Sequence, residues 1–284
     1  MIVPGAETQA FAAALSAAVD EPLGRVEYEQ FADGEHVVRV PEAVAGERAV
    51  VVASTVDSDA HVQLLQLQDA VREAGASEVV TVIPYMGYAR QDEAFRTGEP
   101  VSSRAMARAI SSGTDRVVTV MPHEPAVCDF FDVPATHVDA AGVLAAPLPD
   151  DLSAPLFLSP DEGAISLAET VRDAYGSGET DHFVKDRDYD TGEIEITPND
   201  ADVAGRDVVL TDDIIATGST MSESIEVLHD RDVARVFVTC VHPMLAANAL
   251  TKLSTAGVAA VYGTDTLERA VSEVSAAPAV ADVL

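Results

Sequence analysis

Two adjacent acids at the end of an apolar run are the residues of this chain with the clearest chemical use. The stretch VVLTDDIIATGST (Val208–Thr220) is a buried-strand pattern that ends at Asp212 and Asp213 and continues into a polar loop. Neighbouring carboxylates repel each other, so a fold that keeps them side by side indicates a bound partner. Carboxylate oxygens accept hydrogen bonds from hydroxyl groups and bind Mg²⁺. The pair therefore predicts a site for sugar hydroxyls or for magnesium.

The loop after the acids has the composition of a phosphate site. Gly218 permits a tight turn, and successive backbone amides at the start of a helix can cradle a phosphate. Hydroxyl donors flank this glycine at Thr217, Ser219 and Thr220. A molecule with a phosphate at one end and vicinal hydroxyls at the other fits both halves of the string, and ribose 5-phosphate is such a molecule. The alternative for the string alone is a helix N-cap beside solvated acids.

A sheet must position these residues, and the chain has the alternation typical of a parallel one. Short apolar runs alternate with segments whose apolar residues recur at helical spacing. Strands are predicted over Ala49–Thr55, Glu78–Pro84, Arg116–Pro122, Ala154–Pro160, Asp207–Asp213, Ala234–Val241 and Ala259–Asp265. Helices are predicted over His61–Gly75, Ser102–Ser112, Gly163–Gly176 and Ser219–Arg231. In an open α/β sheet ligands bind beyond the carboxyl ends of the strands, which is where the acidic string lies.

This alternation predicts an α/β protein with two similar domains, each a mainly parallel sheet flanked by helices. We place the domains at residues 1–145 and 146–284, with the last residues able to pack on the N-terminal domain. The segment Ala145–Pro155 is rich in proline and acid and is predicted to link them.

The charge of the chain excludes several function classes. Asp and Glu number 48 against 17 Lys and Arg, a net charge of −31, yet 48% of the residues are hydrophobic, which argues against disorder. Molar salt shortens the Debye length to roughly 3 Å and screens such repulsion. We therefore interpret the acidity as halophilic adaptation to a salt-filled cytoplasm. A broad basic face for nucleic acid is not expected.

Localisation is predicted from what the sequence lacks. No run of about 18 uncharged apolar residues is present, so we expect no membrane span. The N-terminal residues do not resemble a signal peptide. Cys128 and Cys240 are isolated in sequence and are interpreted as thiols in a reducing compartment. Together these features predict a cytoplasmic protein.

The acidic string resembles the phosphoribosyl diphosphate (PRPP) binding motif of type I phosphoribosyltransferases and of ribose-phosphate diphosphokinases, the PRPP synthetases. Transferases usually carry an acid where this chain has Ala216, so the resemblance favours a synthetase. The segment IPYMGYARQDEAFRTGEPVSSR (Ile83–Arg104) resembles the ATP-binding segment of synthetases. Its arginines suit a polyphosphate; they are Arg90, Arg96 and Arg104, with Arg108 nearby.

Further segments resemble synthetases in the same order along the chain. FADGE (Phe31–Glu35) resembles a loop that contacts adenine and ribose. MPHEPAVCDFFDVP (Met121–Pro134) resembles the segment that carries the family histidine, and SPDEGA (Ser159–Ala164) resembles a loop whose aspartate helps to hold magnesium. HFVKDRD (His182–Asp188) lies at the place of the mobile catalytic loop. Departures from the family pattern are Met121 in place of an acid and Glu162 in place of a small residue.

The resemblance implies roles residue by residue. For ATP binding it implies Phe31, Asp33, Glu35, Arg90, Gln91, Asp92 and His123. For ribose 5-phosphate it implies Asp212, Asp213, Thr217, Gly218, Ser219 and Thr220. For the metal it implies His123 and Asp161, with Mg²⁺ as cofactor, and for catalysis Lys185 and Arg187.

The implied protein is a ribose-phosphate diphosphokinase of archaeal, halophilic type, with phosphoribosyltransferase-like domains and with ATP and ribose 5-phosphate as substrates. In the family the FADGE loop comes from a neighbouring subunit, which implies a homo-oligomer with the ATP site at a subunit interface. Two alternatives stay open: a phosphoribosyltransferase that consumes PRPP, and a non-catalytic regulatory paralogue. Lys185 is one of only two lysines, and the other, Lys252, is predicted to lie on the solvated face of a helix.

Overall fold

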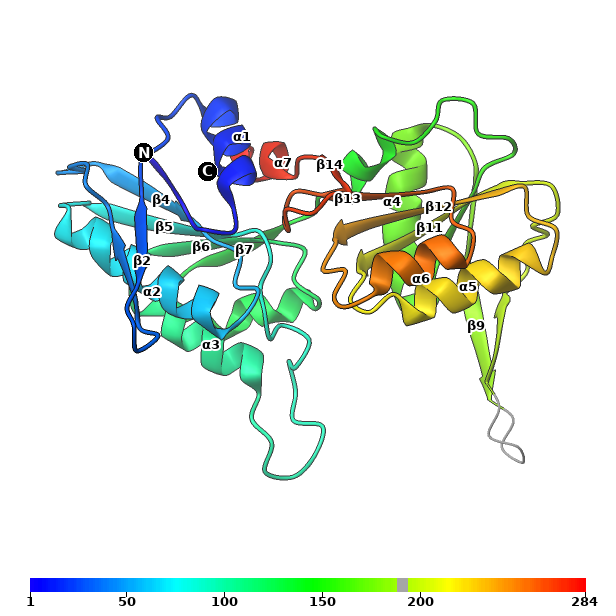
Figure 1. Ribbon diagram of the computed structural model, residues 1–284, viewed down its shortest axis with the longest axis horizontal. Helices are drawn as coiled ribbons and strands as arrows, with labels where there is room; N and C mark the ends of the chain where they lie inside the picture. The colour runs from blue at the N-terminus through cyan, green and yellow to red at the C-terminus, as the bar shows by residue number, and fades with distance from the viewer. Residues whose placement is uncertain (188–193) are drawn as a thin grey trace. The chain divides into compact units, whose positions relative to one another are not determined.

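The computed structural model describes the backbone of residues 1–187 and 194–284, and the side chains of all but residues 185–196. The chain forms two compact units, which are described separately (Figure 1). The first comprises Met1–Asp139, Asp265–Glu268 and Ser275–Leu284, and the second comprises Ala140–Thr264 and Arg269–Val274. The division therefore lies at residue 140 instead of 146, the segment Ala145–Pro155 lies inside the second unit, and the C-terminal residues return to the first.

The first unit is built on a five-stranded, all-parallel sheet in the order β1-β4-β5-β6-β7. Its strands are β1 (Ile2–Pro4), β4 (Arg48–Val52), β5 (Glu78–Ile83), β6 (Arg116–Val120) and β7 (Ala135–Val138). The central strands are nearly continuous valine runs because helices cover both faces of a parallel sheet. The helices are α1 (Gln9–Val19), α2 (Ser58–Glu73), α3 (Ser102–Ser111), the 3₁₀ turn η1 (Pro125–Phe130) and α7 (Ala277–Ala281). A separate antiparallel hairpin joins β2 (Glu27–Gln30) and β3 (His36–Arg39).

The second unit is built on a seven-stranded sheet in the order β10-β9-β8-β11-β12-β13-β14. Its strands are β8 (Leu156–Ser159), β9 (Glu179–Arg187), β10 (Ile194–Pro198), β11 (Asp207–Ile214), β12 (Arg235–His242), β13 (Ala260–Thr264) and β14 (Ser272–Val274). All pairs are parallel except β9 with β10, whose hairpin extends past the rest of the sheet (Figure 1). The helices are α4 (Ile165–Tyr175), α5 (Ser219–His229) and α6 (Ala249–Thr255), with 3₁₀ turns η2 (Ala141–Ala145) and η3 (Glu162–Ala164).

The predicted fold class is confirmed, and each predicted helix and strand is present with small shifts of its ends. Among the strands that were not predicted, β1 and β14 are short and β2 is polar and exposed. Strand β9 is nine residues long and includes His182–Arg187, which the resemblance had placed in a mobile loop. Within the described residues, no helix combines the length and apolarity that crossing a membrane requires.

The amino end of β11 is held by an ion pair whose acid is buried. Asp207 is 1% exposed and accepts hydrogen bonds from Nε and Nη2 of Arg235 at 2.9 and 2.6 Å, and from the Ser153 amide at 2.6 Å. The bonds from Arg235 hold the pKa of Asp207 below its ordinary value. This anchor fixes the strand whose opposite end carries Asp212 and Asp213.

Candidate active site

The carboxyl ends of two neighbouring strands bring acids to one edge of the second unit. β8 and β11 pair in parallel, so Asp161, just after β8, lies at the same edge as Asp212 and Asp213. Oδ1 of Asp212 accepts the Asp213 amide at 2.9 Å, and Oδ1 of Asp213 accepts the Ile214 amide at 2.7 Å. These bonds orient both partly buried carboxylates.

The acid pair carries electrostatic strain. Burial raises the pKa of Asp212 well above its ordinary value, and the charges of Asp213 and Asp161 raise it further. A cation or a set of hydroxyl donors would relieve this strain by supplying positive charge or further hydrogen bonds. The arrangement has the chemistry predicted for the hydroxyl or metal end of the site.

The phosphate loop follows directly, and we use this name for residues Ile215–Thr220. Gly218 has a φ of +71°, a left-handed conformation that glycine adopts without cost, and it precedes α5. The carbonyls of Ile215 and Ala216 accept the amides of Leu245 and Ala246 at 2.9 and 2.8 Å. Among the described residues no side chain caps the first turn of α5, so that turn can offer its amides to an anion.

The environment of Lys252 differs from the solvated helix face predicted from the sequence. Its Nζ lies on α6 and donates a 2.8 Å hydrogen bond to Oγ of Ser219 in the phosphate loop. The side chain is partly buried and is not on a solvated face. Helical periodicity shows on which face of a helix a residue lies but not what that face packs against. The rarity of lysine in this chain was applied to Lys185 alone, and it is the signal that could have found Lys252 as well.

The segment after β5 in the first unit lies against the end of β4. Oγ1 of Thr55 accepts the Gly87 amide at 2.9 Å, and Oγ of Ser54 accepts the Tyr85 amide at 3.1 Å. At its far end the carbonyl of Gln91 accepts the amide and the hydroxyl of Ser103 at 3.2 and 3.1 Å. The segment from Tyr85 to Gln91, which contains Arg90, is thus fixed at both ends by hydrogen bonds, and those at its start are buried.

The arginines of this segment are available to an anion. Arg90, Arg96, Arg104 and Arg108 are exposed, and none forms an ion pair within 4.0 Å with a carboxylate of the described residues. Other arginines of the same acidic chain, such as Arg39 and Arg48, pair with glutamates. Unpaired guanidinium groups beyond a strand end suit phosphate oxygens.

His123 and the three predicted ATP residues of the FADGE turn lie on exposed loops of the first unit. His123 follows β6, the parallel neighbour of β5, and so lies at the same edge of the sheet as the arginine segment. FADGE forms the turn between β2 and β3, where Phe31 is 45% exposed and Asp33 and Glu35 are exposed. The Gly34 amide donates to the Phe31 carbonyl and closes the turn. An exposed aromatic beside two acids suits a stacked base with hydrogen-bonding groups.

Comparison with known proteins places this geometry in a family. A family model described as the N-terminal domain of ribose phosphate pyrophosphokinase matches residues 1–113, and a phosphoribosyl transferase domain model matches residues 138–264. A ribose-phosphate pyrophosphokinase of Halobacterium salinarum is 64% identical, with all of both chains covered. The chain belongs to the ribose-phosphate pyrophosphokinase family.

Other members of this family show the same full-length relation. A ribose-phosphate pyrophosphokinase of Methanosarcina mazei is 42% identical over 100% of this chain and 94% of its own. The crystal structure of phosphoribosylpyrophosphate synthetase from Mycobacterium smegmatis superposes with a TM-score of 0.84 at 27% identity, over 100% of this chain and 96% of that one. The similarity therefore includes both units, not the phosphoribosyltransferase-type unit alone.

The predicted metal ligands belong to different units, His123 to the first and Asp161 to the second. Where the structure describes side chains, no group of three or more His, Cys, Asp or Glu forms a ready-made metal cluster. The oxygen donors of the acid edge fit Mg²⁺, which prefers carboxylates together with substrate phosphates and water. The donor chemistry thus agrees with the pyrophosphokinase assignment.

The predicted catalytic residues lie on β9. The backbones of Lys185 and Arg187 pair with Ile196 and Ile194 of β10. Their side chains lie outside the described residues, and their roles stay predictions.

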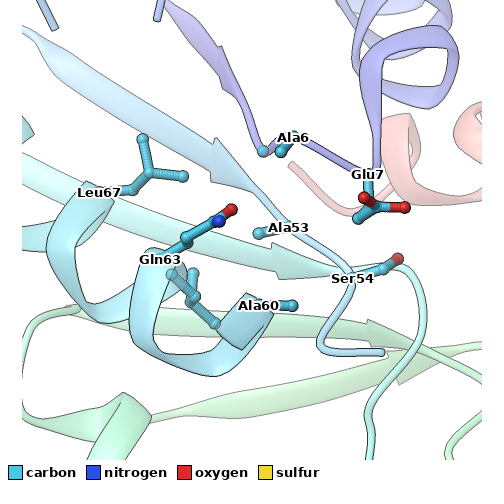
Figure 2. A pocket seen from close by; sticks show the side chains of 9 residues that line it. Ala6, Glu7, Ala53, Ser54, Ala60, Gln63 and Leu67 are labelled. Carbon is cyan, nitrogen blue, oxygen red and sulfur yellow. The ribbon is translucent and has the colours of Figure 1, made fainter. Parts of the chain in front are cut away.

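A small cavity of the first unit is not a substrate site. It lies at the carboxyl ends of β1 and β4 and is lined by Ala6, Glu7, Ser54 and Gln63 among others (Figure 2). Its volume of about 10 Å³ is room for one water molecule at most, far below that of a nucleotide.

Gly87→Ala is expected to damage the ATP side of the protein. A Cβ at this position would lie 2.0 Å from the Thr55 carbonyl oxygen, so the segment before Arg90 must move. We expect a loss of about 1–3 kcal/mol in the free energy of unfolding and a higher KM for ATP. Gly142→Ala is the control because its Cβ would meet no atom closer than 3.8 Å. Thermal melting and ATP titration of both variants check this. Equal melting temperatures and equal KM values for ATP in Gly87→Ala and Gly142→Ala would contradict the prediction.

Proposed function

We propose that this protein transfers the β,γ-diphosphoryl group of ATP to the 1-hydroxyl of ribose 5-phosphate, giving PRPP and AMP for nucleotide biosynthesis. The observation that carries the proposal is the acid pair joined to a phosphate loop at one strand end, in a chain of the ribose-phosphate pyrophosphokinase family. One end of that string suits the ribose hydroxyls and the other suits the 5-phosphate.

The residues divide the work as follows. Asp212 and Asp213 hold the ribose hydroxyls, and the loop from Thr217 to Thr220 holds the 5-phosphate. Arg90, Gln91 and Asp92 bind ATP, together with His123 and the FADGE residues Phe31, Asp33 and Glu35. The 1-hydroxyl attacks the β-phosphorus in line and AMP leaves, a reaction that depends mainly on positioning and charge neutralisation.

Two groups complete the proposed site. Lys185 and Arg187 close over the transferring diphosphoryl group and stabilise its charge. Asp161 and His123 hold Mg²⁺, which neutralises phosphate charge when bound. We also propose a cytoplasmic homo-oligomer in which the exposed FADGE turn completes the ATP site of a neighbouring subunit.

One assay tests the function. The protein is incubated with ATP, ribose 5-phosphate and magnesium chloride in molar KCl, and AMP and PRPP are quantified together. Equal amounts of the two products are expected. A phosphoribosyltransferase would instead consume added PRPP in the presence of a nucleobase, and a regulatory paralogue would give neither product.

Stability is expected to require salt. With a net charge of −31, self-repulsion opposes the compact state in dilute buffer, and salt screens it. The melting temperature should rise steadily from low to multimolar KCl. Calorimetry over a KCl series checks this, and equal melting temperatures at both extremes would refute halophilic adaptation.

A further inference from the structure

We propose that Lys252 is a binding residue for the 5-phosphate, holding the hydroxyl of Ser219 in place and contacting the phosphate itself. The proposal rests on the proposed function and deepens it by assigning to the phosphate loop a cation that the sequence string does not contain. It comes from a different helix, 32 positions beyond the loop's last residue, Thr220.

The first support is the contact itself. The 2.8 Å bond from Nζ of Lys252 to Oγ of Ser219 joins α6 to the first residue of α5. The two elements also meet at the backbone, where the position of a Cβ on Gly218 would lie 3.3 Å from Ala249. Lys252 is therefore held beside the loop by packing and is not a passing surface contact. Oγ1 of Thr217 lies 3.5 Å from the same Ser219 oxygen, so the lysine contacts the hydroxyl that lies next to a second hydroxyl of the phosphate loop.

The second support is the positive charge of the Lys252 ammonium. In a chain with 48 acids, the Lys252 ammonium has no carboxylate within 4.0 Å among the residues whose side chains are described. An ammonium has three N–H donors, and Ser219 accepts one of them. The donors that remain, beside the amides of the first turn of α5, are suited to phosphate oxygens.

The third support is the solvent in which the protein is expected to act. In molar salt a charge acts over roughly 3 Å, so general basicity near a site has little effect. A cation in direct contact keeps its effect. A lysine retained at hydrogen-bond distance from the loop, in a chain with only two lysines, fits this requirement.

The test compares three variants in molar KCl. Lys252→Met removes the charge at nearly constant length, and Lys252→Arg restores it. Arg231→Met is the matched control, because it removes the same charge from an exposed residue beyond the opposite end of α5, about 16 Å along the helix. For each variant we measure kcat, the KM values of ribose 5-phosphate and ATP, the melting temperature, and direct calorimetric binding of ribose 5-phosphate.

Lys252→Met is expected to weaken ribose 5-phosphate binding roughly ten- to a hundredfold, as for loss of a charged hydrogen bond, with the KM of ATP nearly unchanged. Lys252→Arg should recover part of the loss, and Arg231→Met should show none. Equal affinities for Lys252→Met and the unaltered protein would overturn the proposal, as would equal losses in Lys252→Met and Arg231→Met. If Lys252→Met does not fold, Lys252→Gln decides by the same binding measurement. An unaltered protein that binds ribose 5-phosphate but forms no PRPP would contradict the proposed function and leave this inference to be decided by binding.

Discussion

Replacing Asp212 with asparagine is expected to raise the melting temperature of the ligand-free protein near neutral pH and to remove most of its PRPP formation, at least about a hundredfold. Asparagine keeps the oxygen that accepts the Asp213 amide but removes a charge that burial and Asp213 disfavour. The same change removes an acceptor for ribose hydroxyls or metal. Stability and activity should therefore move in opposite directions, as at other sites that keep strain for binding.

The effect of Asp212→Asn on stability should depend on pH in a definite direction. Because the pKa of Asp212 is raised above its ordinary value of 3.8, the folded protein binds the proton more tightly than the unfolded chain does. Ionising Asp212 therefore costs stability as pH rises from 3.8 through the raised pKa. The advantage of Asp212→Asn should be complete above that window and absent below it.

Asp207→Asn is the matched control at the other end of β11. Hydrogen bonds from Arg235 lower the pKa of Asp207, so its ionised form stabilises the fold, and that stability is lost as pH falls through the lowered pKa. Asp207→Asn should therefore lower the melting temperature near neutral pH. Calorimetry of both variants from acid to neutral pH in KCl checks the contrast, and a shift of the same sign in both would contradict it.

Lys185→Ala is expected to reduce kcat by about 10²–10³-fold or more while leaving the melting temperature unchanged. Removing one preorganised donor from a charge that develops in the transition state has an effect of this size. The backbone of Lys185 pairs with β10 on the hairpin that extends past the rest of its sheet, and the pairing of β9 with β8 ends at His182, so the substitution leaves the pairing of the central strands unchanged (Figure 1).

Lys185→Arg is the control for Lys185→Ala, because it keeps the charge and changes the shape of the donor. Steady-state kinetics with both substrates saturating, together with a thermal melt, separate loss of chemistry from loss of fold. Normal turnover in Lys185→Ala would remove this residue from the catalytic assignment.

The predictable part of the fold is the part whose residues are buried on both sides. Valine runs such as Val50–Val52 and Val79–Val80 can satisfy a central parallel strand and little else, so β4 and β5 were placed well from sequence. Strand β7 and the hairpin β2–β3 were not predicted, because four-residue strands with exposed residues have no clear period. Their existence depends on the neighbour with which they pair.

The site was predictable to a similar extent. Asp212 and Asp213 directly precede the phosphate loop in the sequence. They also lie at the carboxyl end of a predicted strand, where ligands bind in open α/β sheets, so both could be placed in the site. Asp161 and Lys252 reach the same region through parallel pairing and helix packing, which sequence spacing does not encode. Resemblance to synthetases supplied the first of these, and only the structure supplied the second.

The main-chain bond from the Ala246 amide to the Ala216 carbonyl has an evolutionary consequence. It would form with nearly any residue at position 216, because a carbonyl is common to all of them. The shape of the phosphate loop is therefore insensitive to the side chain at the position where transferases usually carry an acid. A single codon change there could exchange a reactive group for an inert one without refolding, which leaves this loop free to serve both the making and the consumption of PRPP in diverging lineages.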